Sequence, residues 1–243
     1  LMLIPALVFM FFFELAPIFG NIMAFQDYNP GLGWFRSPYV GLKNFTFMFR
    51  IPDSAQVFGN TLIIATWKVV LGLIAPIALS LLLNEVRSHT FRRAVQTLVY
   101  LPHFLSWVIL AGIISNLLAL NGIVNRMLIA FGLEEPILFL ADNQFFRPML
   151  ISTHLWKETG FSTIVYLAAI SSISLSLYES AVIDGAGRFQ RMRFITLPSM
   201  LPTIVLLATL SLGGILNAGF EQIFNLYNPL VYRTADIIDT YVF

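Results

Sequence analysis

The sequence has no cysteine among its 243 residues. That absence excludes disulfide bridges, thiolate metal sites and thiol nucleophiles. Charge is also scarce: 11% of the residues are charged and 58% are hydrophobic, whereas a soluble domain has about 25% charged residues. A chain with so few charged residues and so many apolar ones is suited to lipid rather than to water as its main solvent.

The sequence also lacks the usual signatures of catalysis. It contains no G-x-x-x-x-G-K-[ST] phosphate loop and no G-x-S-x-G nucleophile elbow. Its three histidines, His89, His103 and His154, do not have metal-ligand spacing. The net charge of +1, without a cluster of Lys and Arg, gives no sign of a nucleic-acid partner. We therefore predict no catalytic residue, no metal and no cofactor in this chain.

Long apolar runs dominate what is present. A helix crosses the hydrocarbon core with roughly 20 apolar residues, whereas the strands of a membrane barrel alternate over about ten. The runs therefore predict an all-α fold, a polytopic transmembrane helical bundle that forms a single domain over residues 1–243. Five spans are expected, with kinks at Pro17, Pro76, Pro102 and Pro202: 1–25, 57–83, 94–120, 148–170 and 198–224. We expect a sixth span beyond Phe243, because both ends of the sequence lie inside apolar runs.

Positive charges in the loops predict the orientation of the bundle. Loops 84–93 and 171–197 hold six arginines and three acids, whereas the alternate loops, roughly twice as long in total, hold six cations and seven acids. The first pair of loops is therefore expected in the cytoplasm. The sequence predicts a multi-pass protein of the cytoplasmic, or inner, membrane.

The most informative segment is the loop at 176–198. Ser176 and Glu179 have the S-x-x-E spacing of a capping box, so a short helix is expected to begin there. Gly185 and Gly187 are suited to end it, because glycine readily adopts the left-handed conformation of a C-terminal cap. The residues from 188 to 195 then form a basic amphipathic stretch, and Pro198 is expected to start the next span.

This loop resembles the EAA loop of permease subunits of binding-protein-dependent ABC importers. The resemblance lies in Glu-x-Ala, Gly six residues after the Glu, and a later Ile-x-Leu-Pro, with Ser180 where the family usually has alanine. Residues 156–160 and 217–229 are similar to those of the carbohydrate branch, the MalF and LplB types, so the similarity covers most of the chain. The positions that match the coupling loop are Glu179, Ala181, Asp184, Gly185, Ala186, Ile195, Leu197 and Pro198.

The resemblance implies a MetI-like fold and a role in importing oligosaccharides, including uronate-containing ones such as alginate. It also implies that loop 176–198 contacts a separate ATPase. The implied partners are a second homologous permease, two ATP-binding subunits that hold ATP and Mg, and a periplasmic or extracellular solute-binding protein. An ordinary amphipathic linker is the alternative interpretation of this loop.

Two other classes of function remain as alternatives at this point. An intramembrane enzyme, such as a glycosyltransferase, would have only Glu179 and Asp184 as an acidic pair, and the EAA spacing accounts for both. A secondary transporter would be expected to show inverted repeats or midplane carboxylates, and neither is evident in the sequence.

Polar residues inside the spans are candidates for a substrate path, since such residues usually face a cavity or a partner. Amides, carboxylates and aromatic rings suit a sugar, and Lys157 would favour an anionic glycan unless Glu158 and Glu221 opposed it. The alternative is that these residues form packing pairs between helices or subunits. Lys68 is expected to snorkel or to pair with Glu14. The candidate path residues are Trp156, Lys157, Glu158, Asn217, Glu221, Gln222 and Asn225.

Overall fold

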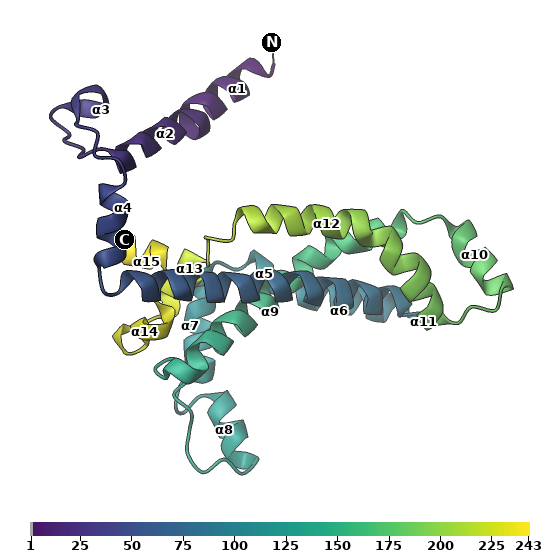
Figure 1. The fold of residues 1–243 in the computed structure, drawn as a ribbon. Coiled ribbons are helices and arrows are strands. Elements are labelled where there is room, and N and C mark those ends of the chain that lie inside the picture. Colours follow the sequence, from purple (N-terminus) through teal and green to yellow (C-terminus); the bar gives the residue numbers. More distant parts are fainter. Residues whose placement is uncertain (1) are drawn as a thin grey trace. The chain divides into compact units, whose positions relative to one another are not determined.

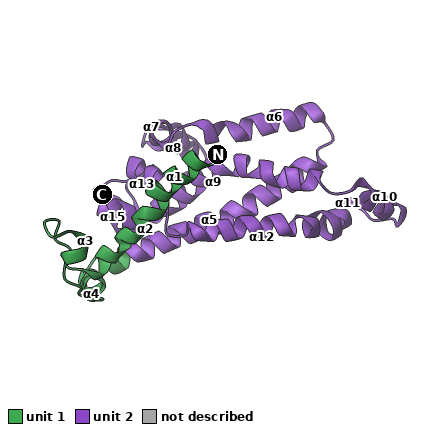
Figure 2. Ribbon diagram, turned by 90° about the horizontal axis from the view of Figure 1, so that it is seen from above, with its two compact units in different colours: residues 1–56 green, residues 57–243 purple. Residues whose placement is uncertain are grey.

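The computed structural model describes residues 2–243, and the described part is almost entirely helical (Figure 1). Its contacts divide it into two compact units, residues 1–56 and residues 57–243 (Figure 2). The predicted all-α class is confirmed, since the described residues form helices and one isolated bridge, between Gln26 and Tyr39.

The first unit consists of one long helix and a following segment that contains two short helices. The helix runs continuously from residue 4 to residue 25 and has no buried residue in its apolar window, so its large side chains are available to lipid. Two amide hydrogen bonds from Asn44, to the carbonyls of Ala24 and Gln26, tie the following loop to the end of this helix. The elements are α1 (Ile4–Met10), the π-helix η1 (Phe11–Leu15), α2 (Ala16–Phe19), the 3-10 helix η2 (Gly20–Phe25), α3 (Gly33–Arg36) and α4 (Lys43–Arg50).

The second unit is a helical bundle, entered through a helix that starts just before the unit boundary. Its elements are α5 (Ser54–Glu85), α6 (His89–Tyr100), η3 (Leu101–Phe104), α7 (Trp107–Leu118), α8 (Ile123–Ala130), α9 (Asn143–Ser171), α10 (Leu175–Ile183), α11 (Arg188–Arg191), the π-helix η4 (Met192–Thr196), α12 (Leu197–Gly213), α13 (Phe220–Leu226), η5 (Pro229–Val231), α14 (Tyr232–Ala235) and α15 (Ile238–Val242).

Four helical stretches are long and apolar enough to cross a membrane, and a bent pair makes a fifth candidate. The four are Ile4–Phe25, Ser54–Glu85, Trp107–Ala130 and Arg188–Gly213, and the pair is α9 with α10, which meet at a bend of 68°. The first and second predicted spans are therefore confirmed, with boundaries shifted by a few residues. The fourth, predicted over 148–170, lies within α9, which passes the length and hydropathy test only together with α10.

The third span, predicted as one run over 94–120, is interrupted. Pro102 lies in the first turn of the short 3-10 helix after α6. Proline is tolerated there because a backbone N–H at this position makes no hydrogen bond within the helix. Ser106 then caps a new helix, with its hydroxyl accepting from the N–H of Ile109 at 3.4 Å. The apolar run is continuous in sequence, but proline and a capping serine divide it into α6 and α7.

The fifth span, predicted over 198–224, was placed about ten residues too late. The helix begins at Arg188 and continues through Pro198 to Gly213. It accommodates Pro198 because the preceding turn, Met192–Thr196, is a π-helix in which the N–H of Leu197 bonds to the carbonyl of Met192. This wider turn makes room for a proline ring that would clash with an α-helical carbonyl.

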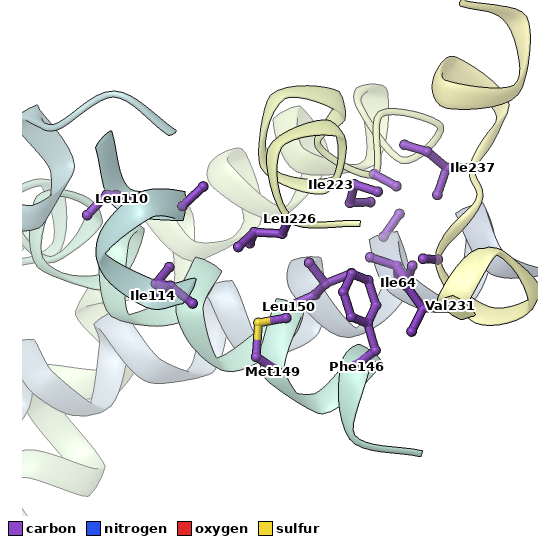
Figure 3. Close-up of a cluster of buried hydrophobic side chains, with 14 residues drawn as sticks. Ile64, Leu110, Ile114, Phe146, Met149, Leu150, Ile223, Leu226, Val231 and Ile237 are labelled. Carbon is purple, nitrogen blue, oxygen red and sulfur yellow. The ribbon is translucent and has the colours of Figure 1, made fainter. Parts of the chain in front are cut away.

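α9 is the central helix of the bundle, in contact with α6, η3, α12, α13 and α14. Its residues Phe146, Met149 and Leu150 form a buried apolar cluster with Ile64 of α5 and Ile223 of α13 (Figure 3). At Gly160, α9 passes so close to α6 that a β-carbon would collide with the backbone of Val99. The bundle is therefore assembled around α9. Its close crossing with α6 requires glycine at position 160.

The C-terminal segment is held to the bundle by polar contacts. The amide of Asn60 on α5 donates to the carbonyl of Asp236 at 2.9 Å, and the guanidinium of Arg147 on α9 donates to the carbonyl of Thr234 at 3.0 Å. Arg147 also donates to the side-chain oxygen of Asn60. These bonds close residues 228–243 over the ends of α5 and α9.

We predict that Gly160→Ala destabilises the bundle, because the added methyl group meets the backbone of Val99 rather than a movable side chain. The melting temperature of the purified protein, measured by thermal unfolding, should fall by roughly 5 °C or more. Gly112→Ala is the matched control, since a β-carbon at this α7 position meets nothing. An equal melting temperature for the two variants would contradict the close crossing of α6 and α9.

Candidate functional site

The segment 176–198 contains the short helix that the sequence predicted, but its first turn differs. α10 begins at Leu175, with Ser174 as its N-cap, so Ser176 lies inside the first turn and the predicted capping box with Glu179 is wrong. The physical reason is that α9 ends at Ser171, and the chain needs only three residues to turn before a new helix starts. The hydroxyls of Ser174 and Ser176 bond to each other at 2.7 Å instead.

The end of α10 agrees with the prediction for Gly185. This residue has φ +79°, a left-handed conformation that favours glycine. The N–H of Ala186 bonds to the carbonyl of Ala181 at 2.8 Å, and the N–H of Gly185 bonds to that of Val182 at 3.0 Å, which is the Schellman pattern. Gly187 does not end α10; it caps the following helix, with its N–H donating to the side chain of Gln190 at 2.7 Å.

α10 stands beyond the ends of α9 and α12 in both views of the bundle (Figures 1 and 2). Its apolar side chains are open: Leu175 is 75% exposed and Ile183 is 86% exposed. One hydroxyl pair, Tyr178 with Thr196 at 2.8 Å, joins the helix to the base of the next span. α10 is thus a small helix with an uncovered apolar surface, fastened to two spans.

Most of the predicted loop residues meet at one hollow of about 270 Å³, which lies between α10 and the next span. Glu179 is exposed on α10 itself, and Leu197 and Pro198 lie farther along the span. The predicted residues that line the hollow are Ala181, Asp184, Gly185, Ala186 and Ile195.

A second cavity, of about 390 Å³, lies inside the bundle between α5, α9, α12 and the connection that precedes α13. Hydroxyl and amide side chains contribute part of its lining, and no Phe, Tyr or Trp lines it. Its volume is in the range of about 300–1,000 Å³ that is typical of ligand sites. The lining residues are Ala65, Lys68, Val69, Gly72, His154, Leu155, Glu158, Thr159, Ser162, Ser211, Asn217, Ala218 and Gly219.

Lys68 is the buried cation of this cavity. Its ammonium group donates to the carbonyl of Ala218 at 2.6 Å and to the side-chain oxygen of Gln222 at 2.5 Å, so it does not snorkel to an interface. The amide nitrogen of Gln222 in turn donates to α9, to the carbonyl of Leu150 at 2.7 Å and to the hydroxyl of Thr153 at 2.8 Å. Gln222 therefore connects α5, α9 and α13.

Lys157 is buried among packing contacts and does not line the cavity. It is 6% exposed, donates to the carbonyl of His103 at 2.7 Å and lies 5.6 Å from the ring centroid of Trp107. Glu158, its neighbour, lies 2.8 Å from Nδ1 of His103 and 3.6 Å from the ammonium group of Lys157. The carboxylate of Glu158 is therefore held by Lys157 and His103 at the edge of the cavity.

The candidate path residues are thus divided between different places. Glu158 and Asn217 line the cavity, whereas Lys157 and Gln222 are buried in packing contacts. Asn217 is not on the fifth span as predicted, because the helix ends at Gly213 and Asn217 precedes α13. The remaining three lie exposed and do not line the cavity: Trp156, Glu221 and Asn225.

Sequence reasoning missed several residues of the cavity, although a signal for them exists. On α9, His154, Glu158 and Ser162 follow one another at four-residue spacing, which places a polar stripe on one helix face. On α5, Lys68 and Gly72 have the same spacing. No group of three or more potential metal ligands occurs within residues 2–243.

Known proteins resemble this chain over its whole length. The family model for the binding-protein-dependent transport system inner membrane component matches residues 68–243. Protein LplB of Bacillus subtilis is 42% identical over 100% of this chain and 76% of its own length. The polygalacturonan/rhamnogalacturonan transport system permease protein YteP of the same organism is 43% identical over the same shares.

A solved structure agrees with these relatives. A chain of a bacterial ABC transporter involved in the import of the acidic polysaccharide alginate has a TM-score of 0.89 and 44% sequence identity to this chain, covering 99% of it and 81% of the other. The same type of transporter, solved with a periplasmic protein bound to an alginate pentasaccharide, gives a TM-score of 0.90. This chain belongs to the family of binding-protein-dependent transport system inner membrane components and is a multi-pass permease of a sugar ABC importer.

Proposed function

We propose that this chain passes acidic oligosaccharides through its internal cavity and is driven by separate ATPase subunits that bind α10. The observation that carries the proposal is that the bundle has a helix with an uncovered apolar surface at one end, and inside it a cavity that contains Lys68 and several hydroxyl groups. The proposed partners are a second homologous permease, two ATP-binding subunits and an external solute-binding protein. ATP and Mg belong to the ATP-binding subunits.

The shape of α10 supports the ATPase contact. Ile183 and Leu175 expose apolar surface that a partner would cover. The helix is linked to α9 by three residues and to the next span by the Schellman turn and by the bond between Tyr178 and Thr196. A displacement of α10 would therefore move the two flanking helices with it, nearly as a rigid body.

The cavity supports an acidic oligosaccharide as the substrate. Lys68 uses two of its three ammonium hydrogens within the chain, and the third is available to a uronate carboxylate. Hydroxyl groups of Thr159, Ser162 and Ser211 suit the hydroxyls of a sugar. Lys68 takes the role that the sequence suggested for Lys157, since it is the lysine that lines the cavity. Relatives with alginate and polygalacturonan in their names agree with an acidic glycan.

The first prediction tests the ATPase contact. Gly185→Val should reduce substrate-stimulated ATP hydrolysis by the assembled importer by roughly fivefold or more, because a β-branched residue resists φ +79° and the turn after α10 is lost. Gly187→Val is the matched control, since its backbone is extended and suits a β-branched residue. Equal hydrolysis by the wild type and the Gly185 variant would remove α10 from the coupling path.

The second prediction tests whether ATP is hydrolysed by separate subunits rather than by this chain. The purified chain alone should hydrolyse no ATP, since it has no phosphate loop, and activity should appear when the ATP-binding subunits are added. The measurement is phosphate release at increasing purity of the chain. A rate that stays proportional to the amount of this chain would contradict the proposal.

The third prediction tests the cavity. Ser162→Leu places a larger apolar side chain in the lining and should lower oligosaccharide uptake into reconstituted vesicles by about tenfold, while subunit assembly stays intact. Ser152→Leu is the control, because Ser152 lies exposed on the same helix and does not line this cavity. Unchanged uptake by Ser162→Leu would place the path elsewhere.

A further inference from the structure

A third cavity, of about 620 Å³, lies where the ends of α5 and α9 meet α10 and α11. It is formed by the two loops that the charge distribution predicts on the cytoplasmic side of the membrane, so it lies at the end of the spans on that side. The lining residues are Asn84, Glu85, Val86, Arg87, Ile170, Ser171, Ile173, Leu175, Tyr178, Arg188 and Arg191.

Three arginines face one acid in this cavity. Arg87 comes from the loop after α5, and Arg188 and Arg191 come from α11. Within residues 2–243, no ion pair of 4.0 Å or less joins Glu85 to any of them. The cavity therefore has an excess of positive charge that the described chain does not neutralise.

The position of two of these arginines strengthens the argument. Arg188 and Arg191 lie in the first turn of the continuous helix Arg188–Gly213, which has no acid in that turn. The positive end of the helix dipole disfavours cations there. An anion between the guanidinium groups would offset the unfavourable interaction of the arginines with the helix dipole and their repulsion of one another.

One donor of Arg191 also lacks an acceptor. Its Nε atom is buried, and it has no hydrogen-bond partner within the described chain. A buried donor without a partner destabilises the folded protein. An anionic oxygen beside this guanidinium would supply what the chain does not.

We propose that this cavity binds a phosphate group through Arg87, Arg188 and Arg191. Guanidinium groups bind phosphate oxygens with paired, charge-assisted hydrogen bonds, and a site at the cytoplasmic end of the spans is open to phosphate from two sources. One is the headgroup of an anionic phospholipid of the inner leaflet, and the other is inorganic phosphate in solution. The site goes beyond the transport role and does not depend on the sugar cavity.

The occupant of this cavity lies against α10 and α11, between the spans and the proposed ATPase contact. A bound phosphate would hold Arg87 on one side and Arg188 with Arg191 on the other, and so fasten the end of α5 to the coupling loop. The site would thus stabilise one arrangement of the joint between the spans and α10.

The test uses the full protein purified together with the subunits that accompany it. In the first arm the complex is reconstituted in equal parts phosphatidylglycerol and phosphatidylcholine, and the phosphatidylglycerol retained after extraction is counted by native mass spectrometry. In the second arm the complex in phosphatidylcholine alone is titrated with radiolabelled inorganic phosphate by equilibrium dialysis. The variants are Arg87→Gln and Arg191→Gln, with Arg93→Gln as the control.

Arg93 is a suitable control because it lies exposed in the neighbouring helix α6, carries the same charge and does not line the cavity. Arg87 is exposed in the segment between α5 and α6, so replacing it should leave the bundle folded even if Arg191→Gln does not. We expect a retained lipid, or a saturable phosphate site, in the wild type and in Arg93→Gln, and an affinity about tenfold weaker or a lost lipid in the other two.

Retention of lipid in the first arm alone assigns the headgroup as the source, and saturable binding in the second arm assigns inorganic phosphate. The proposal is overturned if the wild type binds neither probe, if Arg87→Gln and Arg191→Gln bind as the wild type does, or if Arg93→Gln loses binding equally. Loss of the ATPase subunits from Arg87→Gln, with no phosphate bound to the wild type, would assign the arginines to the subunit contact and also overturn it.

Discussion

The structure depends on one constraint: each polar group that the bundle buries needs a partner within the protein, because lipid supplies none. Gln222 meets this requirement for three helices at once, since it accepts from Lys68 on α5 and donates to Leu150 and Thr153 on α9. Lys157 meets it by donating to a carbonyl that η3 leaves free. The same contacts that satisfy these groups fix the positions of α5, α9 and α13 around the cavity.

Interruptions of the helices provide the carbonyls that these lysines use. The carbonyl of His103 belongs to η3, between α6 and α7, and that of Ala218 belongs to the connection between α12 and α13. Irregular backbone inside a membrane is tolerated where it is buried in protein or lines a cavity, and the connection before α13 lines the cavity through Asn217, Ala218 and Gly219. At Gly219, with φ +92°, a β-carbon would lie 2.8 Å from the ammonium group of Lys68, so the close approach of lysine and backbone requires glycine.

The helices on both sides of loop 176–198 also line the cavity. α9 carries cavity residues such as Glu158 and Ser162 and ends at Ser171, three residues before α10. The span on the other side of α10 carries Ser211, which also lines the cavity. A displacement of α10 therefore reaches two cavity walls through helices whose backbone hydrogen bonds resist bending. The arginine-lined cavity lies beside the connection between α9, α10 and α11.

The sequence by itself determined the class of the fold, the first two spans, the long helix over the fourth, and the glycine turn after α10. Long apolar runs can satisfy their backbone in lipid only as helices, and the spacing of Gly185 from Glu179 is a local property that needs no tertiary contact. The family resemblance is confirmed by a family model over residues 68–243 and by relatives that match the entire chain.

Only the tertiary structure decided where the spans break and which polar residues face the cavity. Apolar residues occur on both sides of Ser106 and of Pro198, so hydropathy alone places neither the break at Ser106 nor the π-helical turn before Pro198. Lys157 and Lys68 are alike in sequence, as single cations in apolar runs. Their roles differ because the carbonyl of His103 is brought to Lys157 from 54 residues away, whereas that of Ala218 is brought to Lys68 from 150 residues away, at the wall of the cavity. Contacts over such separations depend on helix packing, which no local pattern specifies.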